Sequence, residues 1–249
     1  VPALLNNAET WVEMPEEALT QLEELQNMFL RSIFKVPRGT PKPALKWETG
    51  TLPMWARIMV KKLYFLNSIK HQKENVLAKQ VLSEQVRLGL PGLAKECAEI
   101  CQKLGIDNIV KNEIPKGKWK KVVKEASRKY AEKELLREME RLEKTDKIKT
   151  EKFGAKGYIQ DKCVEDARTQ FRIRTNMIDI KMNFKSDPRN SRELWRCDGC
   201  RRTVESQPHI LHCPAYKTLR EGRDVNVDKD LIKYVQDVLV VREKMRQGN

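Results

Sequence analysis

The sequence predicts a mainly α-helical protein that ends in a small Cys/His metal-binding module. Three features of its 249 residues lead to this fold class. Apolar residues recur every three or four positions through most of the chain, which is the period of an amphipathic helix. Clusters of Pro and Gly separate these helical segments. Three of the six Cys and two of the three His lie within 17 residues near the C-terminus.

The first long helix is expected to begin at Pro15. A proline ring fixes a φ value that suits the first helical turn. Glu16 and Glu17 follow in that turn, where their charges stabilise the positive end of the helix dipole. Arg31 and Lys35 lie near the opposite end. The apolar face of this helix consists of Leu19, Leu22, Leu25, Phe29, Ile33 and Phe34.

A connector rich in Pro and Gly follows, from Val36 to Gly50. Its three prolines, Pro37, Pro41 and Pro43, are expected to block a continuous helix. Thr51 is expected to cap the next helix, because its hydroxyl can accept a hydrogen bond from the first turn. The apolar face of that helix consists of Trp55, Ile58, Met59, Leu63, Leu66 and Ile69.

Five further helices are expected along the rest of the chain. They cover residues 75–88, 91–104, 118–142, 163–177 and 228–245. The helical periodicity weakens between Thr145 and Gly157, and we expect a domain boundary there. Residues 1–150 would then form a helical region, and residues 151–249 a basic helical region with the metal module and the C-terminal helix.

The charge balance points to a polyanionic partner. Lys and Arg outnumber Asp and Glu by 49 to 35, which gives a net charge of +14. Such an excess favours nucleic acid or an anionic membrane surface. The apolar runs are too short to span a bilayer, and the N-terminus lacks the layout of a signal peptide. We therefore expect an intracellular segment of a longer protein, nuclear and cytoplasmic, without membrane association.

The Cys/His cluster has the spacing Cys-x2-Cys-x8-His-x3-Cys, formed by Cys197, Cys200, His209 and Cys213. Zinc prefers four tetrahedral thiolate and imidazole ligands, and four protein ligands leave no open position, so we predict one structural zinc ion. His209 and Cys213 share one face of a helical turn, whereas His212 points elsewhere and is expected to be a bystander. The alternative, ordinary thiols beside surface histidines, is disfavoured by the clustering.

Basic and aromatic residues surround this cluster. Cations that hold phosphates, beside rings that stack on bases, are typical of proteins that bind single strands or hairpins. Trp195 and Tyr216 either stack on bases or pack the small core around the metal, and both interpretations stay open. The candidate nucleic-acid contacts are Trp195, Arg196, Arg201, Arg202, Tyr216, Lys217 and Arg220.

A second basic patch is expected on the helix at residues 118–142. Its first half has few acidic residues to offset its lysines, so it is the better candidate for following a phosphate backbone. Its second half mixes both charge signs and is expected to be a solvated face. Trp119 either stacks on a base or joins the core. The candidate contacts are Lys118, Lys120, Lys121 and Lys124.

Four stretches of the sequence are similar to one known family. Three lie near the N-terminus: Leu4 to Trp11 (LLNNAETW), Gln21 to Phe34 and Thr40 to Leu52. The fourth is HILHCPAYKTLREGRD, which begins at His209. The first three resemble the segments that follow the catalytic palm in LINE-type (non-LTR) retrotransposon reverse transcriptases. The fourth resembles the distal zinc motif of that family, with Pro208 where an acidic residue is common.

The resemblance implies a helical thumb-like region, a helical linker and a C-terminal CCHC zinc knuckle. Such a segment would hold template RNA or target DNA for the polymerase part of the same polyprotein. Reverse transcriptases hold two metal ions through an Asp pair, and this sequence has no Asp-Asp dipeptide. The chain as it stands is therefore expected to be no enzyme. The alternative function is a domesticated, zinc-stapled protein-interaction module without polymerase function.

Overall fold

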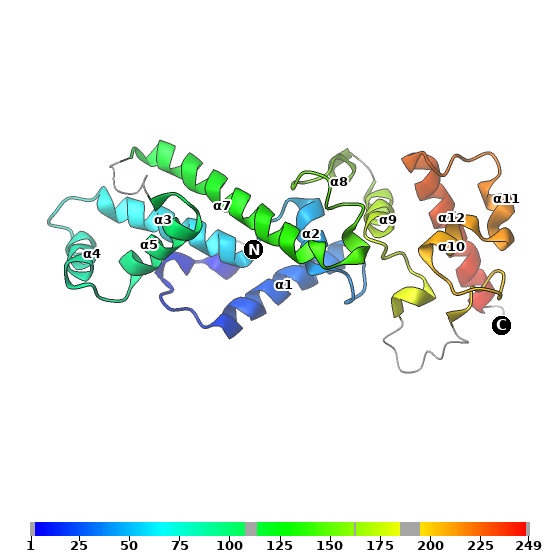
Figure 1. Ribbon diagram of the computed structural model, residues 1–249, viewed down its shortest axis with the longest axis horizontal. Helices are drawn as coiled ribbons and strands as arrows, with labels where there is room; N and C mark the ends of the chain where they lie inside the picture. The colour runs from blue at the N-terminus through cyan, green and yellow to red at the C-terminus, as the bar shows by residue number, and fades with distance from the viewer. Residues whose placement is uncertain (1–2, 108–113, 162, 185–194, 248–249) are drawn as a thin grey trace. The chain divides into compact units, whose positions relative to one another are not determined.

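The computed structural model describes residues 3–107, 114–161, 163–184 and 195–247. Within these ranges the protein is mainly helical, and β-structure is confined to two isolated bridges, Thr49 with Ala155 and Arg196 with Val204. None of the helices in these ranges combines the length and the apolar character that crossing a membrane requires. Figure 1 labels the helices.

The chain forms two compact units. The first contains Val1–Phe29 and Thr51–Glu138, and the second contains Leu30–Gly50 and Met139–Asn249. The division between the units falls inside two helices, α1 (Glu16–Phe34) and α7 (Lys116–Glu140). The sequence predicts a boundary between two domains near residue 150. The division into compact units does not test that boundary, which stays a prediction.

Helix α3 (Met54–Lys70) organises the first unit. Along it pack α4 (Leu77–Leu88), α5 (Leu93–Lys103) and α7, and their apolar side chains form one continuous core (Figure 1). Two short 3-10 helices, η1 (Ala3–Leu5) and η2 (Ala8–Thr10), close the other side of α3. This arrangement leaves the lysines of α7 at the surface, because the apolar side chains of that helix face α3.

The helices form close to where the sequence predicts them, with two corrections. The connector contains a helix, α2 (Lys42–Thr49), because Pro43 lies in its first turn. Backbone N–H groups in the first turn have no acceptor within the helix, so proline, which has no N–H, removes no hydrogen bond there. Pro53, rather than Thr51, occupies the N-cap position of α3, and no side chain caps that helix.

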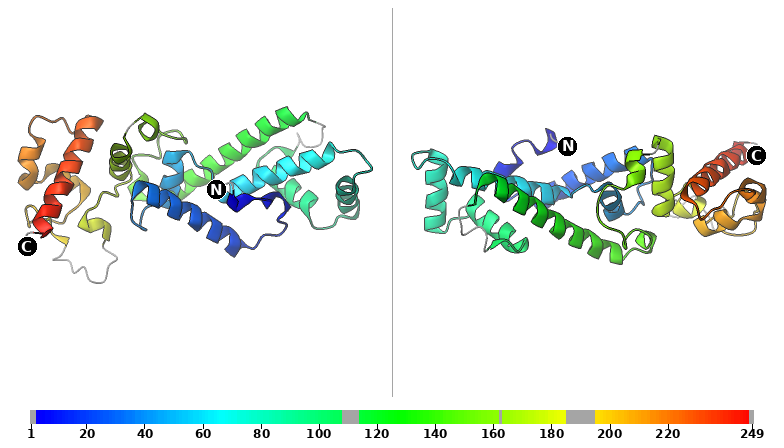
Figure 2. Two further views of the ribbon diagram at one scale, coloured as in Figure 1. Left: turned by 180° about the vertical axis from the view of Figure 1, so that it is seen from behind. Right: turned by 90° about the horizontal axis from the view of Figure 1, so that it is seen from above.

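Within the described residues, two apolar cores lie in the second unit. One joins the end of α1 and α2 to α8 (Gly157–Asp161) and α9 (Val164–Arg174), with Phe34 stacked on Phe171. The other lies around the Cys/His cluster and beneath α12 (Asp228–Gln247). Figure 2 shows α12 beside α10 (Gln207–His212) and α11 (Lys217–Arg220) from two further sides. The remaining short elements are η3 (Glu143–Thr145), η4 (Lys181–Phe184) and η6 (Pro214–Tyr216).

A buried carboxylate fixes α2 against α9 in the first of these cores. Glu48 is completely buried and accepts two hydrogen bonds from the guanidinium of Arg174, at 2.7 and 3.0 Å. It also accepts a hydrogen bond from the Tyr158 hydroxyl at 2.7 Å, and burial beside this carboxylate raises the pKa of Tyr158. Arg174 reaches a second carboxylate, on Glu151, that is partly exposed.

Glu48→Ala should lower the free energy of unfolding by about 3 kcal/mol, because it leaves a largely buried guanidinium without its buried partner. Glu151→Ala is the matched control, since it removes a partly exposed carboxylate from the same guanidinium and should cost less than about 1 kcal/mol. Urea denaturation followed by circular dichroism measures both. Equal losses of stability in the two variants would show that the burial of Glu48 contributes nothing to the free energy of unfolding.

Candidate metal centre

The first two cysteines lie in a tight hairpin. Its two sides meet in the antiparallel bridge between Arg196 and Val204. Cys197 N donates to Thr203 O, and Arg201 N donates to Cys197 O, both at 2.8 Å. Arg201 adopts a left-handed conformation, with φ of 54°, which turns the chain back after Cys200. The hairpin therefore directs both sulfur atoms toward the same side.

The second ligand pair is placed by α10. Ser206 caps this helix, and its hydroxyl accepts a hydrogen bond from His209 N at 3.2 Å. Gln207 is buried and donates to Ile173 O at 2.9 Å, which anchors the start of the helix. Cys213 directly follows α10 as its C-cap residue. His209 and Cys213 thus lie one helical turn apart.

The four predicted ligands converge. One ligand atom from each of Cys197, Cys200, His209 and Cys213 lies within 4.8 Å of all the others. Cys200 Sγ lies 3.4 Å from His209 Nε2, and Cys197 Sγ lies 3.8 Å from Cys213 Sγ. Three sulfurs and one imidazole nitrogen at this spacing can hold one metal ion and are compatible with zinc. The exposed His212 is not in this group.

The ligand thiols differ in their electrostatic surroundings. Burial opposes ionisation of Cys200, but hydrogen bonds from the backbone N–H groups of Arg202 and Thr203 outweigh it and lower its pKa to about 6. Burial raises the pKa of Cys213 to about 12, and the neighbouring Cys197 adds to this rise. A bound cation would stabilise the thiolate form of both residues, because the positive charge offsets the cost of burying them.

Charged residues tie the hairpin to α12. Glu205 and Arg242 are only 0% and 2% exposed, and their carboxylate and guanidinium form two hydrogen bonds at 2.7 and 2.8 Å. Asp198, in the hairpin turn, accepts hydrogen bonds from Lys181 and, at 2.9 Å, from Arg246. Burial opposes ionisation of Asp198, but these two cations hold its pKa below its usual value. They therefore keep the turn charged and fixed.

These supporting residues were missed at the level of sequence, although one signal was present. Arg242 lies seven residues beyond Val235 and four beyond Val238, on the buried face of α12. A cation on an apolar helix face requires a buried anion. The pattern thus indicates that a partner exists, but the identity of that partner, Glu205, depends on how the chain folds back.

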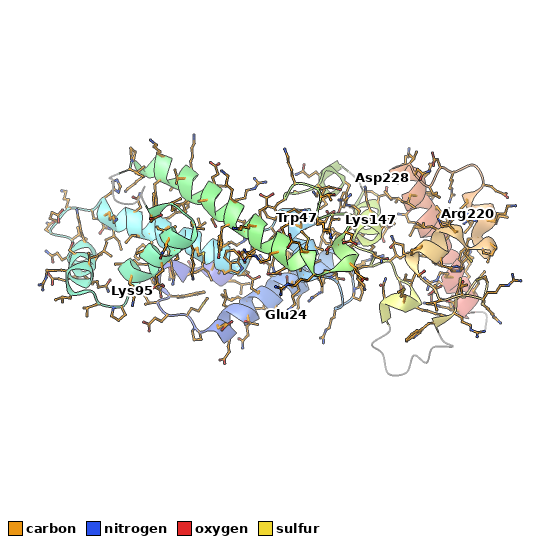
Figure 3. The ribbon with its side chains drawn as sticks, viewed as in Figure 1. Glu24, Trp47, Lys95, Lys147, Arg220 and Asp228 are labelled. Carbon is orange, nitrogen blue, oxygen red and sulfur yellow. The ribbon has the colours of Figure 1, made fainter. Side chains whose placement is uncertain are left out.

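The predicted nucleic-acid contacts around the cluster divide into two groups. Arg196, Arg201, Arg202 and Lys217 are exposed, as their proposed role requires. Of the two interpretations of Tyr216, packing of the small core is the one that the structure supports: it is completely buried against the cluster, so neither face of its ring can stack on a base, and its place among the candidate contacts is corrected. Trp195 is partly buried, and Arg220, labelled in Figure 3, donates a hydrogen bond to Leu211 O at 2.6 Å.

The second predicted patch lies on α7. Lys118, Lys120, Lys121 and Lys124 are all exposed there. Trp119 belongs to the core, because its ring is buried and its Nε1 donates to Leu63 O at 3.0 Å. Of the two interpretations of this tryptophan, core packing is therefore the one that the structure supports.

No family model, curated protein or solved structure matches the chain. The geometry of the cluster and the distribution of charge therefore carry the functional argument.

Gly199→Ala should destabilise the metal centre. A Cβ at this position would lie 2.8 Å from Tyr216 Cζ and 2.9 Å from Ala215 Cβ, and the buried ring has no room to move. We expect a loss of about 1–3 kcal/mol in the free energy of unfolding, as for other overpacked sites. Thermal and urea denaturation measure it.

Gly39→Ala is the matched control, since no atom lies within 4 Å of the added Cβ. If both variants unfold at the same denaturant concentration, the close approach of Gly199 to Tyr216 is not a constraint on the fold.

Proposed function

We propose that this chain binds nucleic acid through a zinc-stabilised module at its C-terminal end. One observation carries the proposal: the four converging ligands fix a hairpin whose tip exposes Arg201 and Arg202. The metal is proposed to be zinc, because three thiolates and one imidazole are its typical tetrahedral set. With four protein ligands the ion is structural, since no coordination position remains for water or substrate.

The exposed cations beside the metal are suited to phosphate binding. Arg196, Arg201, Arg202 and Lys217 all lie within or next to segments that the four ligands fix. Among the described residues, none of these four side chains forms an ion pair, so their charges are available to a partner. A bound metal would hold their backbone in place, which lowers the entropy lost when they contact phosphates.

The resemblance to LINE-type reverse transcriptases gives this binding a context. We propose that the chain is the C-terminal part of such an enzyme, with a thumb-like helical region and a zinc knuckle. It would hold template RNA or target DNA, in the nucleus or the cytoplasm, for a polymerase domain outside this chain. The sequence lacks the Asp pair that holds the catalytic metal ions, so this part would bind rather than polymerise.

The second candidate is a zinc-stapled protein-interaction module, and one observation favours it. Leu77, Val81 and Leu88 lie on one face of α4, and all three are exposed. An exposed apolar stripe on a helix is typical of a surface that meets another protein. The net charge of +14 favours the first candidate, because positive charge strengthens the binding of a polyanion more than the binding of an apolar partner.

The purified protein should contain one zinc ion per chain, and His209→Ala should abolish it. Loss of one ligand opens the site and unfolds the module, because structural zinc in small sites supplies on the order of 10 kcal/mol of apparent binding energy. His212→Ala, which changes the neighbouring exposed imidazole, should leave the zinc content unchanged. Elemental analysis measures both. Zinc that is lost in His212→Ala but kept in His209→Ala would reverse the ligand assignment.

Binding to single-stranded RNA should weaken as salt increases, and the variant with Arg201→Gln and Arg202→Gln should show a shallower dependence. Each phosphate contact contributes about 0.7 log units of affinity per log unit of salt for single strands. Fluorescence anisotropy at several salt concentrations measures the slope. The exposed Lys147 and Lys229, changed together to Gln, form a control of equal charge, with Lys147 labelled in Figure 3.

Zinc content and helicity should stay unchanged in both double variants, because the altered side chains do not support the fold. If the wild-type protein binds RNA without salt dependence, or not at all at low salt, the nucleic-acid proposal is wrong. The protein-interaction candidate then takes its place.

A further inference from the structure

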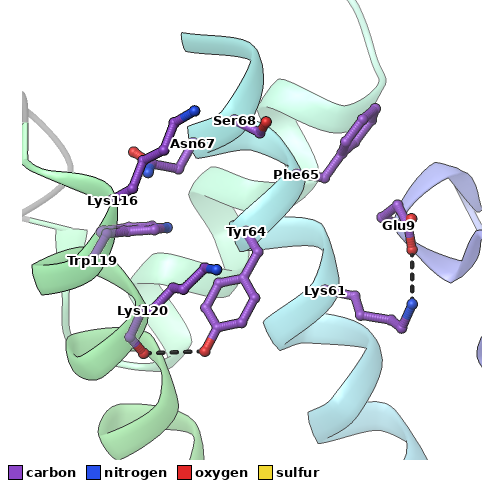
Figure 4. Close-up of a pocket in the computed structure, with 9 residues that line it drawn as sticks. All are labelled: Glu9, Lys61, Tyr64, Phe65, Asn67, Ser68, Lys116, Trp119 and Lys120. Carbon is purple, nitrogen blue, oxygen red and sulfur yellow. Dashed lines mark hydrogen bonds and ion pairs between the residues drawn. The ribbon is translucent and has the colours of Figure 1, made fainter. Parts of the chain in front are cut away.

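A groove runs between α3 and α7 within the first unit. It consists of two neighbouring cavities of about 440 and 410 Å³ that share Lys61 and Tyr64 in their walls. Each has the size of a pocket for a small organic ligand, about 300–1,000 Å³. Figure 4 shows Lys116, Trp119 and Lys120 of α7 facing the α3 side chains across the first cavity.

The walls of this groove are strongly basic. From α7 come Lys116, Lys120 and Lys124, which lie on one face because they are four residues apart, a rise of about 6 Å each. Arg57 and Lys61, also four residues apart, come from α3. Among the described residues, no carboxylate forms an ion pair with any of the three α7 lysines.

Two carboxylates partly offset this charge, Glu23 by its electrostatic attraction to Arg57 and Glu9 at the edge of the groove. Glu9, in η2, forms an ion pair with Lys61 at 3.2 Å (Figure 4). Hydrogen bonding to the backbone and to Lys61 lowers the pKa of Glu9, so it is charged at neutral pH. A bound anion would have to compete with Glu9 for Lys61, while the α7 lysines remain available.

The groove also contains an aromatic ring and neutral polar groups. Tyr64 lines both cavities, and Lys120 Nζ lies 5.9 Å from its ring centroid. The Tyr64 hydroxyl donates a hydrogen bond to Lys120 O at 3.1 Å, and this bond holds the ring between the two helices. Asn67 and Ser68 lie along the same wall. A row of cations around a fixed ring suits a chain of phosphates and bases, because the ring can stack on a base.

We propose that this groove binds a single-stranded segment of nucleic acid, with phosphates on Lys116, Lys120 and Lys124 and a base against Tyr64. The inference rests on the proposed function and adds a second binding surface to it, distinct from the basic residues of the metal module. A single strand fits better than a duplex, because only an unpaired base can enter the groove and reach a half-buried ring.

The lysines are tested in the full chain with a fluorescein-labelled 12-nucleotide oligo-uridine. Lys116→Gln, Lys120→Gln and Lys124→Gln together should lower affinity at least ten-fold. Each phosphate contact contributes about 0.7 to the slope of log affinity against log salt concentration, so the loss of three contacts should reduce this slope by about 2. The control combines Lys129→Gln, Lys133→Gln and Arg137→Gln, which changes the same charge at exposed positions in the second half of the same helix, outside the groove and outside the predicted basic patch. It should lower affinity less than three-fold.

Equal losses in the two triple variants would overturn the groove and leave the proposed function intact, because the binding would then follow net charge alone. A wild-type protein that does not bind the oligonucleotide would overturn both. Glu9→Gln offers a change in the opposite direction: it releases Lys61, so affinity should rise, and an unchanged affinity would exclude Lys61 from the site.

The ring is tested by Tyr64→Leu against Tyr64→Phe. Leucine removes the stacking surface and should lower affinity about five-fold or more, whereas phenylalanine keeps the ring and should bind as the wild type does. Poly-glutamate serves as the second probe, because it carries charge without bases. If poly-glutamate binds as tightly as the oligonucleotide and Tyr64→Leu affects neither, the groove accepts acidic peptides and the nucleic-acid assignment is wrong.

Discussion

The buried ion pair between Glu205 and Arg242 holds the C-terminal module together. Removing two charges from water costs several kcal/mol each, so such a pair persists only where the geometry is good and the remaining polar atoms are satisfied. Here the guanidinium meets the carboxylate through two hydrogen bonds and also donates to Asp179 O. Because Glu205 directly follows the hairpin, this pair fixes the metal ligands against α12.

The same arrangement recurs at Glu48 and Arg174, where a fully buried carboxylate orients an arginine between α2 and α9. In a chain of net charge +14, buried carboxylates restrain those cations that must face inward. Among the described residues, Arg31, Lys46 and Lys62 are also buried, whereas the lysines of α7 and Arg196, Arg201, Arg202 and Lys217 lie at the surface. This separation of structural and surface cations is the physical basis for proposing a polyanionic partner.

The two proposed binding surfaces differ in what makes them rigid. At the hairpin, a metal ion bound by Cys197, Cys200, His209 and Cys213, which lie close together, would hold a short segment. In the groove, Trp119 anchors α7 to α3 from the core side, and the next residue, Lys120, is thereby placed over Tyr64. A tryptophan that the sequence also allowed as a base contact thus contributes indirectly, by setting the distance between the two walls.

The sequence by itself determined the mainly helical fold and which four Cys and His side chains could hold a metal ion, because apolar periodicity and Cys/His spacing are local properties. It failed at α2, where proline in the first turn permits the helix that proline elsewhere would block. Only the tertiary structure decided that Tyr216 is buried, that Glu205 pairs with Arg242, and that Arg57, Lys61 and Tyr64 join the lysines of α7. These pairings connect residues far apart in the chain, and their physical cause is the packing of whole helices, which no local pattern of residues contains.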